Sequence, residues 1–287
     1  MAEKSTEEYA LENGLFRVGA KQPLTQYIAE TVERLQFAYT LAAFSNEAGN
    51  AKSRIGGWWN LLIPTMQAAS YGLIFGVIMG RQRPDNFLPF LFTGVFLFSF
   101  IQGCFTGGAS SIVNRTGLVR TLNFPRVLLP LSIVISQVLS LFPQLLVLSV
   151  ILVIVQGIGT ISLNWLMLIP LIAMMSLFSF GLAMIMARVT VHVQDLNKLI
   201  PFISRILFYS SGVFFAVEKI LNSDNVFAKV ITANPIFQFL NLARGYLVEG
   251  YHADPAEWIS VSLWTVGLVV FGFIFFWGAE ERYGRED

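Results

Sequence analysis

The chain has 287 residues, of which 55% are hydrophobic and only 13% are charged, and its mean hydropathy is +0.63. A soluble domain carries about 25% charged residues, so this composition predicts an integral membrane protein and excludes an ordinary soluble enzyme. The net charge of +1 gives no support for nucleic-acid binding, which needs a basic stripe.

Residues 1–57 are predicted to form a cytosolic N-terminal segment that contains an amphipathic helix. From Leu24 to Tyr39, apolar residues recur at helical spacing, with Glu30 and Glu33 on the opposite face. This helix is too charged to cross a bilayer. It either lies in the plane of the membrane interface or packs on a cytosolic partner, and the sequence leaves both alternatives open.

The rest of the chain, residues 58–287, is predicted to be a transmembrane domain with six spans joined by polar links. Each apolar run is close to the roughly 20 residues that an α-helix needs to cross the hydrocarbon core. The spans are residues 58–79, 87–111, 127–155, 165–187, 199–217 and 258–277. In the first span, Gly72, Gly76 and Gly80 would allow close helix packing, either within the subunit or against a second copy.

Two apolar pieces, residues 226–231 and 235–248, lie between spans five and six, and each is too short to cross. A sharp turn at residues 233–235 separates them, which predicts a re-entrant helical hairpin. The expected fold class is therefore an all-α integral membrane protein. It would have six transmembrane helices, an N-terminal amphipathic interface helix and this hairpin.

A short charged break, residues 188–198, separates the fourth and fifth spans. Backbone at membrane depth has to be helical or part of a closed barrel, so a segment this polar lies outside the bilayer. We interpret it as a cytosolic hinge at which force enters the membrane domain. A solvated loop without such a role is the simpler alternative.

The distribution of lysine and arginine predicts that both termini are cytosolic. The short loop 113–126 holds Arg115, Arg120 and Arg126 and no acid, whereas the loop 156–164 holds no charge. Loops rich in Lys and Arg stay on the cytosolic side.

An energy source is missing from the chain itself. Residues 14–21 approach a phosphate-binding loop, but Ala20 separates the second glycine from Lys21, which has to follow it directly. There is no zinc-binding H-E-x-x-H motif and no Cys/His cluster with ligand spacing, so no cofactor and no metal are predicted in this chain.

Four pieces of the chain, in order and at matching spacing, resemble ABC-2 type permeases that export polysaccharides and teichoic acids. They are residues 54–59 (RIGGWW) with Pro64 and Tyr71, 123–132 (NFPRVLLPLS), 194–202 (QDLNKLIPF), and 211–214 (SGVF) with 234–244 (NPIFQFLNLAR). The family usually has Arg and Pro where this chain has Gln194 and Gly212, so the substrate does not follow by analogy. The Phe-rich second span resembles that of actinobacterial cell-wall galactan exporters.

The resemblance implies a homodimer of six-span subunits in the bacterial inner (plasma) membrane. Two copies of a separate ATPase subunit, which would hold ATP and Mg, would drive outward movement of a polyprenyl-diphosphate-linked polysaccharide, O-antigen-like or galactan. Residues 189–198 would then be a coupling helix seated in a groove of the ATPase. Its predicted contact residues are His192, Gln194, Asp195 and Asn197.

Three phenylalanines on one face of the second span, Phe92, Phe96 and Phe100, are candidates to line the sugar path. Sugar rings present apolar C–H faces that pack on aromatic rings, while their hydroxyl groups need polar partners such as Gln67 or Gln102. Phenylalanines at helical spacing are equally typical of a core or a lipid-facing surface.

Arg205 places a charge inside the predicted fifth span, which costs about 2.5–3.5 kcal/mol at mid-membrane. We expect it to meet the diphosphate of the lipid carrier, with Tyr209, one turn further on, also in the substrate path. Alternatively Arg205 snorkels to the cytosolic surface, because Lys198 lies only about 10 Å before it along a helix.

Two other functions remain as alternatives. A membrane-embedded glycan-modifying enzyme would use His252, Asp254 and Glu257, the cluster on the last outer loop, although a solvated loop explains these residues more simply. A permease for teichoic acid would use the same fold. A secondary carrier is disfavoured because the sequence has no internal repeat.

Overall fold

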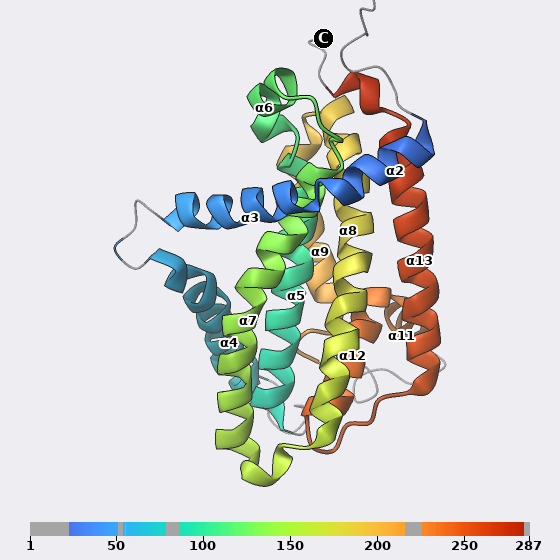
Figure 1. Ribbon diagram of the computed structural model, residues 1–287. Helices are drawn as coiled ribbons and strands as arrows, with labels where there is room; N and C mark the ends of the chain where they lie inside the picture. Colours follow the sequence, from blue (N-terminus) through green and yellow to red (C-terminus); the bar gives the residue numbers. More distant parts are fainter. Residues whose placement is uncertain (1–22, 51–53, 55, 79–85, 216–225, 284–287) are drawn as a thin grey trace, which may run out of the picture.

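The computed structural model describes residues 23–50, 54, 56–78, 86–215 and 226–283, and every regular element in them is a helix (Figure 1). Five helices are long and apolar enough to cross a membrane, and they coincide with predicted spans one to four and six. They are α4 (Trp59–Ile78), α5 (Phe87–Ser110), α7 (Leu128–Gln156), α8 (Leu168–His192) and α13 (Pro255–Trp277). The chain is thus a multi-pass helical membrane protein.

The predicted fifth span corresponds to α9 (Leu196–Ser210), which has only 15 residues and falls short of the roughly 20 needed to cross alone. Gly212, with φ of +59°, follows its last turn and ends the helix. The shorter helices are α2 (Leu24–Glu33), α3 (Leu35–Asn50), α6 (Thr116–Thr121), α11 (Val226–Ala233) and α12 (Pro235–Leu247). Single 3-10 turns are η1 (Gly56–Trp58), η3 (Val113–Arg115), η4 (Ile158–Thr160), η5 (Leu163–Met167) and η6 (Glu280–Arg282).

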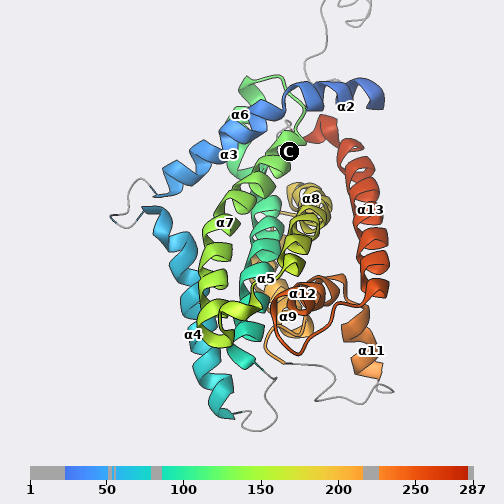
Figure 2. The same ribbon diagram turned by 60° about the horizontal axis from the view of Figure 1, so that its bottom comes forward.

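Helix α5 is the centre of the bundle. In its most apolar stretch 72% of the residues are buried, against 17 to 39% in the other four candidate spans. α4 and α13 lie on opposite sides of the bundle, with α5 and α8 between them (Figures 1 and 2). α8 approaches both neighbours closely: a methyl group on Gly108 of α5 would meet Ala183, and one on Gly272 of α13 would lie 2.7 Å from the carbonyl oxygen of Gly181.

The glycines flagged in the first span pack within the subunit. A methyl group on Gly72 would lie 3.4 Å from Leu88 and Leu91 of α5, and one on Gly76 would lie 3.6 Å from Phe87. Both glycines therefore face the start of α5, while Gly80 lies outside the described residues.

The two ends of the bundle differ. One end, here called the turn end, holds the turn between α8 and α9, residues 193–195, together with α2, α3 and α6 at the top of Figure 1. The opposite loop end holds the start of α5 and the end of α12, where the Asn86 amide donates to the Glu249 carbonyl at 3.0 Å. Gln156 at the end of α7 also accepts from the Glu249 N–H there, at 2.6 Å.

The predicted amphipathic helix is two helices, α2 and α3, which meet at Arg34 and lie crosswise over the turn end (Figure 1). Tyr27 and Thr31 face the bundle and are buried, whereas Ile28 and Val32 on the same predicted apolar face are exposed. The helix thus packs on its own subunit with one edge of that face and leaves the other edge free.

A buried polar cluster fastens α2 to the bundle. The Tyr27 hydroxyl donates to a carboxylate oxygen of Glu280 at 2.9 Å and accepts from the Val127 N–H at 3.1 Å. The Arg126 N–H donates to the other carboxylate oxygen at 3.1 Å, and its guanidinium donates to the Glu280 carbonyl. Glu280, only 6% exposed, thereby joins α2, the start of α7 and the end of α13.

Burial raises the pKa of the Glu280 carboxyl, and the contacts with Arg126 and Tyr27 oppose that rise. A carboxyl whose pKa is higher in the folded state contributes stability that is present at low pH and is lost as pH rises through the folded-state pKa. Glu280→Gln should remove this loss, so the stability of the variant relative to wild type should increase as the pH rises above the usual carboxyl range. Thermal unfolding of the purified protein over this rise in pH checks the slope. Glu33→Gln, on the exposed side of α2, is the matched control, and equal slopes for Glu280→Gln and wild type would contradict the prediction.

Candidate functional site

The turn between α8 and α9 projects from the bundle. α8 continues to His192 and α9 begins at Leu196, so residues 189–198 form a helix end, a turn and a helix start and not the separate coupling helix that was predicted. His192, Gln194 and Asp195 are exposed and Asn197 is half-buried. The four predicted contact residues are thus brought together on the helix end, turn and helix start of residues 189–198, which we call the elbow.

Among the residues that the structure describes, Asp195 makes no contact that would explain it as a structural residue. Its carboxylate pairs with Lys198 at 2.9 Å, but the side chains are 85% and 82% exposed, respectively. Such surface ion pairs contribute about 0–1 kcal/mol. Both charges therefore remain accessible to a partner.

The elbow itself is held firmly on both sides. The Thr190 hydroxyl, which is buried, donates to the carbonyl of Ala109 at the end of α5. The Arg188 guanidinium donates to the carbonyl of Phe275 in α13, and its carbon lies 3.9 Å from the centroid of that residue's ring. These contacts join the elbow to the central helix and to α13.

The predicted sugar-path phenylalanines lie inside the subunit. Phe92, Phe96 and Phe100 are 9, 0 and 2% exposed and belong to the main hydrophobic core. Phe92 packs edge-to-face on Phe96, with 5.7 Å between ring centroids. This placement matches the core alternative and leaves a substrate no access to these rings in the described conformation.

A different set of rings is accessible, and we call it the aromatic patch: Tyr71 and Phe75 of α4, Phe208 and Tyr209 of α9, and Phe214. Phe75 stacks on Phe214 at 4.3 Å, Tyr71 lies 5.2 Å from Phe208, and Tyr209 lies 5.8 Å from Phe214. Tyr209 is 47% exposed and the other four rings are half-buried. Tyr71 and Phe75 lie four residues apart on α4, and this spacing was the sequence signal that could have identified them.

Arg205 lies on α9 one turn before Tyr209 and is exposed. The exposed side of α9 also carries Leu199, Phe202 and Ile206. Of the predicted substrate-path residues, Tyr209 therefore belongs to the aromatic patch and Arg205 lies on the same surface. The three phenylalanines of α5 do not.

Arg244 of α12, in the interior of the bundle, holds the backbone next to the aromatic patch. It is 1% exposed, and its guanidinium lies 3.5 Å from the centroid of the Phe90 ring. It donates to the carbonyls of Phe90 at 3.3 Å and Val213 at 2.7 Å. A methyl group on Gly94 would lie 2.5 Å from this guanidinium, so the glycine leaves room for it. The bond to Val213 fixes the backbone next to Phe214.

The alternative enzymatic cluster has structural roles. Asp254 caps α13 by accepting from the Ala256 N–H at 2.8 Å, and Glu257 accepts from the Asn241 amide of α12 at 2.8 Å. His192 and His252 lie at opposite ends of the bundle. No group of three His, Cys, Asp or Glu side chains with metal-site geometry occurs in the part of the chain that the structure describes.

These features define an all-helical membrane protein with a firmly anchored polar elbow and an accessible aromatic surface. Residues 48–248 match the sequence profile of the family described as ABC-2 type transporter. The chain belongs to this family, as its motifs predicted.

Relatives with known names support a narrower comparison. The chain is 29% identical to the O-antigen export system permease protein RfbA of Klebsiella pneumoniae over 226 residues, 76% of this chain and 84% of the relative. It is 25% identical to the protein of the same name from Myxococcus xanthus, over 76% of this chain and 82% of the relative. The polysialic acid transport protein KpsM of Escherichia coli is 23% identical over 80% of this chain and 88% of its own length.

Replacing Arg244 by Met should destabilise the protein strongly. The variant leaves the carbonyls of Phe90 and Val213 without their donor, at about 1–3 kcal/mol for each buried acceptor. Thermal unfolding of the purified protein in detergent measures the effect. Arg282→Met, at an exposed position, is the matched control, and equal unfolding temperatures for the two variants would contradict the role assigned to Arg244.

Proposed function

We propose that this chain is the membrane permease subunit of an ATP-driven exporter that moves a lipid-linked polysaccharide across the bacterial inner (plasma) membrane. The observation that carries the proposal is the alignment, over at least 76% of this chain, with relatives named for exporting O-antigen and polysialic acid. The proposed substrate is a glycan joined to a polyprenyl diphosphate. A separate ATPase subunit, present in two copies, supplies the energy.

The turn end is proposed to face the cytosol, which places both termini there. Arg34, Arg115 and Arg126 belong to elements at this end, while the loop 156–164 at the opposite end has no Lys or Arg. Lys and Arg are retained on the cytosolic side. With this orientation, the exposed apolar residues of α2 lie in the headgroup region on the cytosolic side of the membrane.

A sixth crossing is proposed for α9 together with residues 211–215. α9 runs antiparallel to α5: Ile200 packs with Phe105 and Ala109, and Phe208 contacts Phe98 at 5.1 Å. The Val213 carbonyl then reaches Arg244 beside Phe90, one turn from the start of α5. The chain from the elbow to Val213 thus follows α5 along most of its length.

The re-entrant hairpin is proposed for α11 and α12. They meet at Asn234, whose side-chain amide donates to the Ser211 hydroxyl at 3.1 Å, and α12 then runs to the loop end. Val213 and Leu247 both lie towards that end, so a hairpin between them enters and leaves on one side.

The elbow is proposed to couple ATP hydrolysis to transport. It would insert into a groove of the ATPase, with Asp195 in a charged contact and His192, Gln194 and Asn197 around it. The anchors at Thr190 and Arg188 support this role because they pass a displacement to α5 and α13.

The substrate path is proposed to follow the aromatic patch. α4 and α9 leave broad apolar faces exposed on either side of the patch. A second copy of the chain packed on these faces would enclose the rings, and the sugar C–H faces would pack on them. Arg205, on the same surface, would meet the diphosphate of the carrier.

Reversing the charge at Asp195 should uncouple the exporter. In a complex of the Asp195→Arg chain with its ATPase, export should fall about 10-fold or more while ATP hydrolysis continues, because a lost interfacial charge contact costs about 2–5 kcal/mol. Glycan export into inverted vesicles and phosphate release are measured together. Glu33→Arg makes the same charge change on α2 and should leave both rates unchanged. Undiminished export by Asp195→Arg would refute coupling through this residue.

Alanine at Phe75 or Phe214 should reduce export by about 2–13-fold, since a ring contact is worth about 0.5–1.5 kcal/mol. Both rings are half-buried and are not core residues. Phe142→Ala, on the exposed face of α7, removes a ring of equal size away from the patch. Normal export by both patch variants would exclude the patch from the path.

Substitutions of Arg205 distinguish two possible roles of this residue, phosphate recognition and snorkelling. Phosphate recognition through the planar guanidinium is lost in both Arg205→Lys and Arg205→Gln, whereas a snorkelling role tolerates Lys. Wild-type ATPase stimulation by lipid-linked glycan in both variants would leave Arg205 outside the substrate path.

A further inference from the structure

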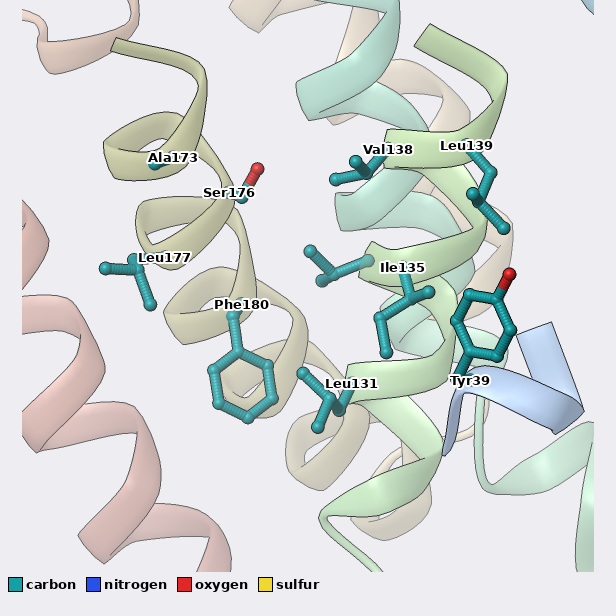
Figure 3. A pocket seen from close by; sticks show the side chains of 10 residues that line it. Tyr39, Leu131, Ile135, Val138, Leu139, Ala173, Ser176, Leu177 and Phe180 are labelled. Carbon is teal, nitrogen blue, oxygen red and sulfur yellow. The ribbon is translucent and has the colours of Figure 1, made fainter. Parts of the chain in front are cut away.

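Two cavities of similar size open on the bundle, and their linings differ. One, of about 530 Å³ between α7 and α8, is lined almost entirely by apolar side chains (Figure 3). Its Ser176 hydroxyl donates to the Ile172 carbonyl of its own helix. The other, of about 410 Å³, lies between α3, α4, α5 and α7 and is polar. Six side-chain amides line it: Asn46, Asn60, Gln67, Gln102, Gln137 and Gln144.

The polar cavity has unused hydrogen-bonding capacity. Gln144 is only 7% exposed, and its Nε2 donates to the Asn60 carbonyl at 2.9 Å. Its Oε1 is buried and has no partner among the described residues, which costs about 1–3 kcal/mol unless a ligand or water supplies a donor. The amides of Gln67 and Gln102 line the same cavity and make no side-chain hydrogen bond within the described part of the chain.

The backbone leaves space for one of these amides. A methyl group on Gly103 of α5 would collide with the side-chain amide of Gln137 of α7. Gly103 therefore leaves room for the Gln137 side chain in the lining of the cavity, and a single added carbon at this position would displace it.

The chemistry of the lining selects a neutral ligand. No Asp, Glu, Lys or Arg is among the described residues that line the cavity, so an anionic phosphate would find no counter-charge. The amides of Gln67 and Gln102 each carry both donors and an acceptor, and Gln144 adds the acceptor Oε1, which matches the hydroxyl groups of a sugar. Trp59 and Pro64 add an apolar surface for its C–H face. The volume falls within the 300–1,000 Å³ typical of small-molecule sites.

We propose that this cavity binds one neutral sugar ring. The ring belongs either to the exported glycan, in which case the site rests on the proposed function, or to the headgroup of a membrane glycolipid. The site is separate from the aromatic patch. It lies in the half of the bundle nearer the turn end, because its α4 residues, Trp59 to Gln67, belong to the first half of that helix.

Saturation-transfer NMR on the purified chain in phosphatidylcholine nanodiscs tests the proposal with two probes. Maltotriose stands for a glycan, and a glucosyl diacylglycerol placed in the disc stands for a glycolipid. We expect transfer to the ring protons of at least one probe. It should weaken by about 5-fold or more in Gln144→Leu and in Gly103→Ala, because each removes or displaces one hydrogen-bonding group.

The matched control is Gln36→Leu, which makes the same substitution on the exposed side of α3 and should bind as wild type does. Transfer to maltotriose assigns the cavity to the glycan, and transfer to the glycolipid alone assigns it to the membrane. Absence of transfer from both probes, or equal transfer in all variants, overturns the proposal and leaves a water-filled cavity. The assay needs neither ATPase nor export, so a failure of the proposed function would leave this result standing.

Discussion

The fold depends on satisfying an irregular stretch of backbone next to α5. Inside a bilayer no water is available to bond to free carbonyl groups, so non-helical chain persists only where the protein supplies partners. After α9 ends at Ser210, residues 211–215 leave the helical pattern, and Arg244 supplies a donor to Val213. Burying a guanidinium is expensive, and the Phe90 ring together with two carbonyls offsets that cost.

Around this point the helices of the bundle differ in how closely they pack and how much of their surface is exposed. α5, α8 and α13 pack so closely at Gly108, Gly181 and Gly272 that side chains hardly separate their backbones. α9 instead touches α5 through the rings of Phe208 and Phe98, and α4 meets α9 through Tyr71 and Phe208. Both α4 and α9 keep much of their surface exposed. The elements with tight contacts are those to which the elbow is anchored. The more exposed helices, α4 and α9, carry most of the aromatic patch.

Much of this arrangement could be predicted from sequence, and the failures have physical reasons. Apolar runs of span length located α4, α5, α7, α8 and α13, because bilayer thickness fixes helix length. The length of α9 was overestimated, because hydropathy cannot detect that Gly212 ends the helix.

The candidate site was harder to predict. Phe92, Phe96 and Phe100 share a face, but periodicity alone does not say whether a face meets substrate, lipid or another helix. Arg244 was visible only as the last residue of a motif. Its partners at Phe90 and Val213 are more than 30 positions away in the chain, and no local pattern encodes them.

The backbone contact between Gly181 and Gly272 has a mechanical consequence. At this contact no side chain separates the two backbones, so we expect α8 and α13 to tilt together as one unit. This helix pair holds the elbow at the end of α8, and Glu280 lies just beyond the end of α13. Because Tyr27 bonds to Glu280, we expect α2, which lies over the turn end, to follow any tilt of this unit.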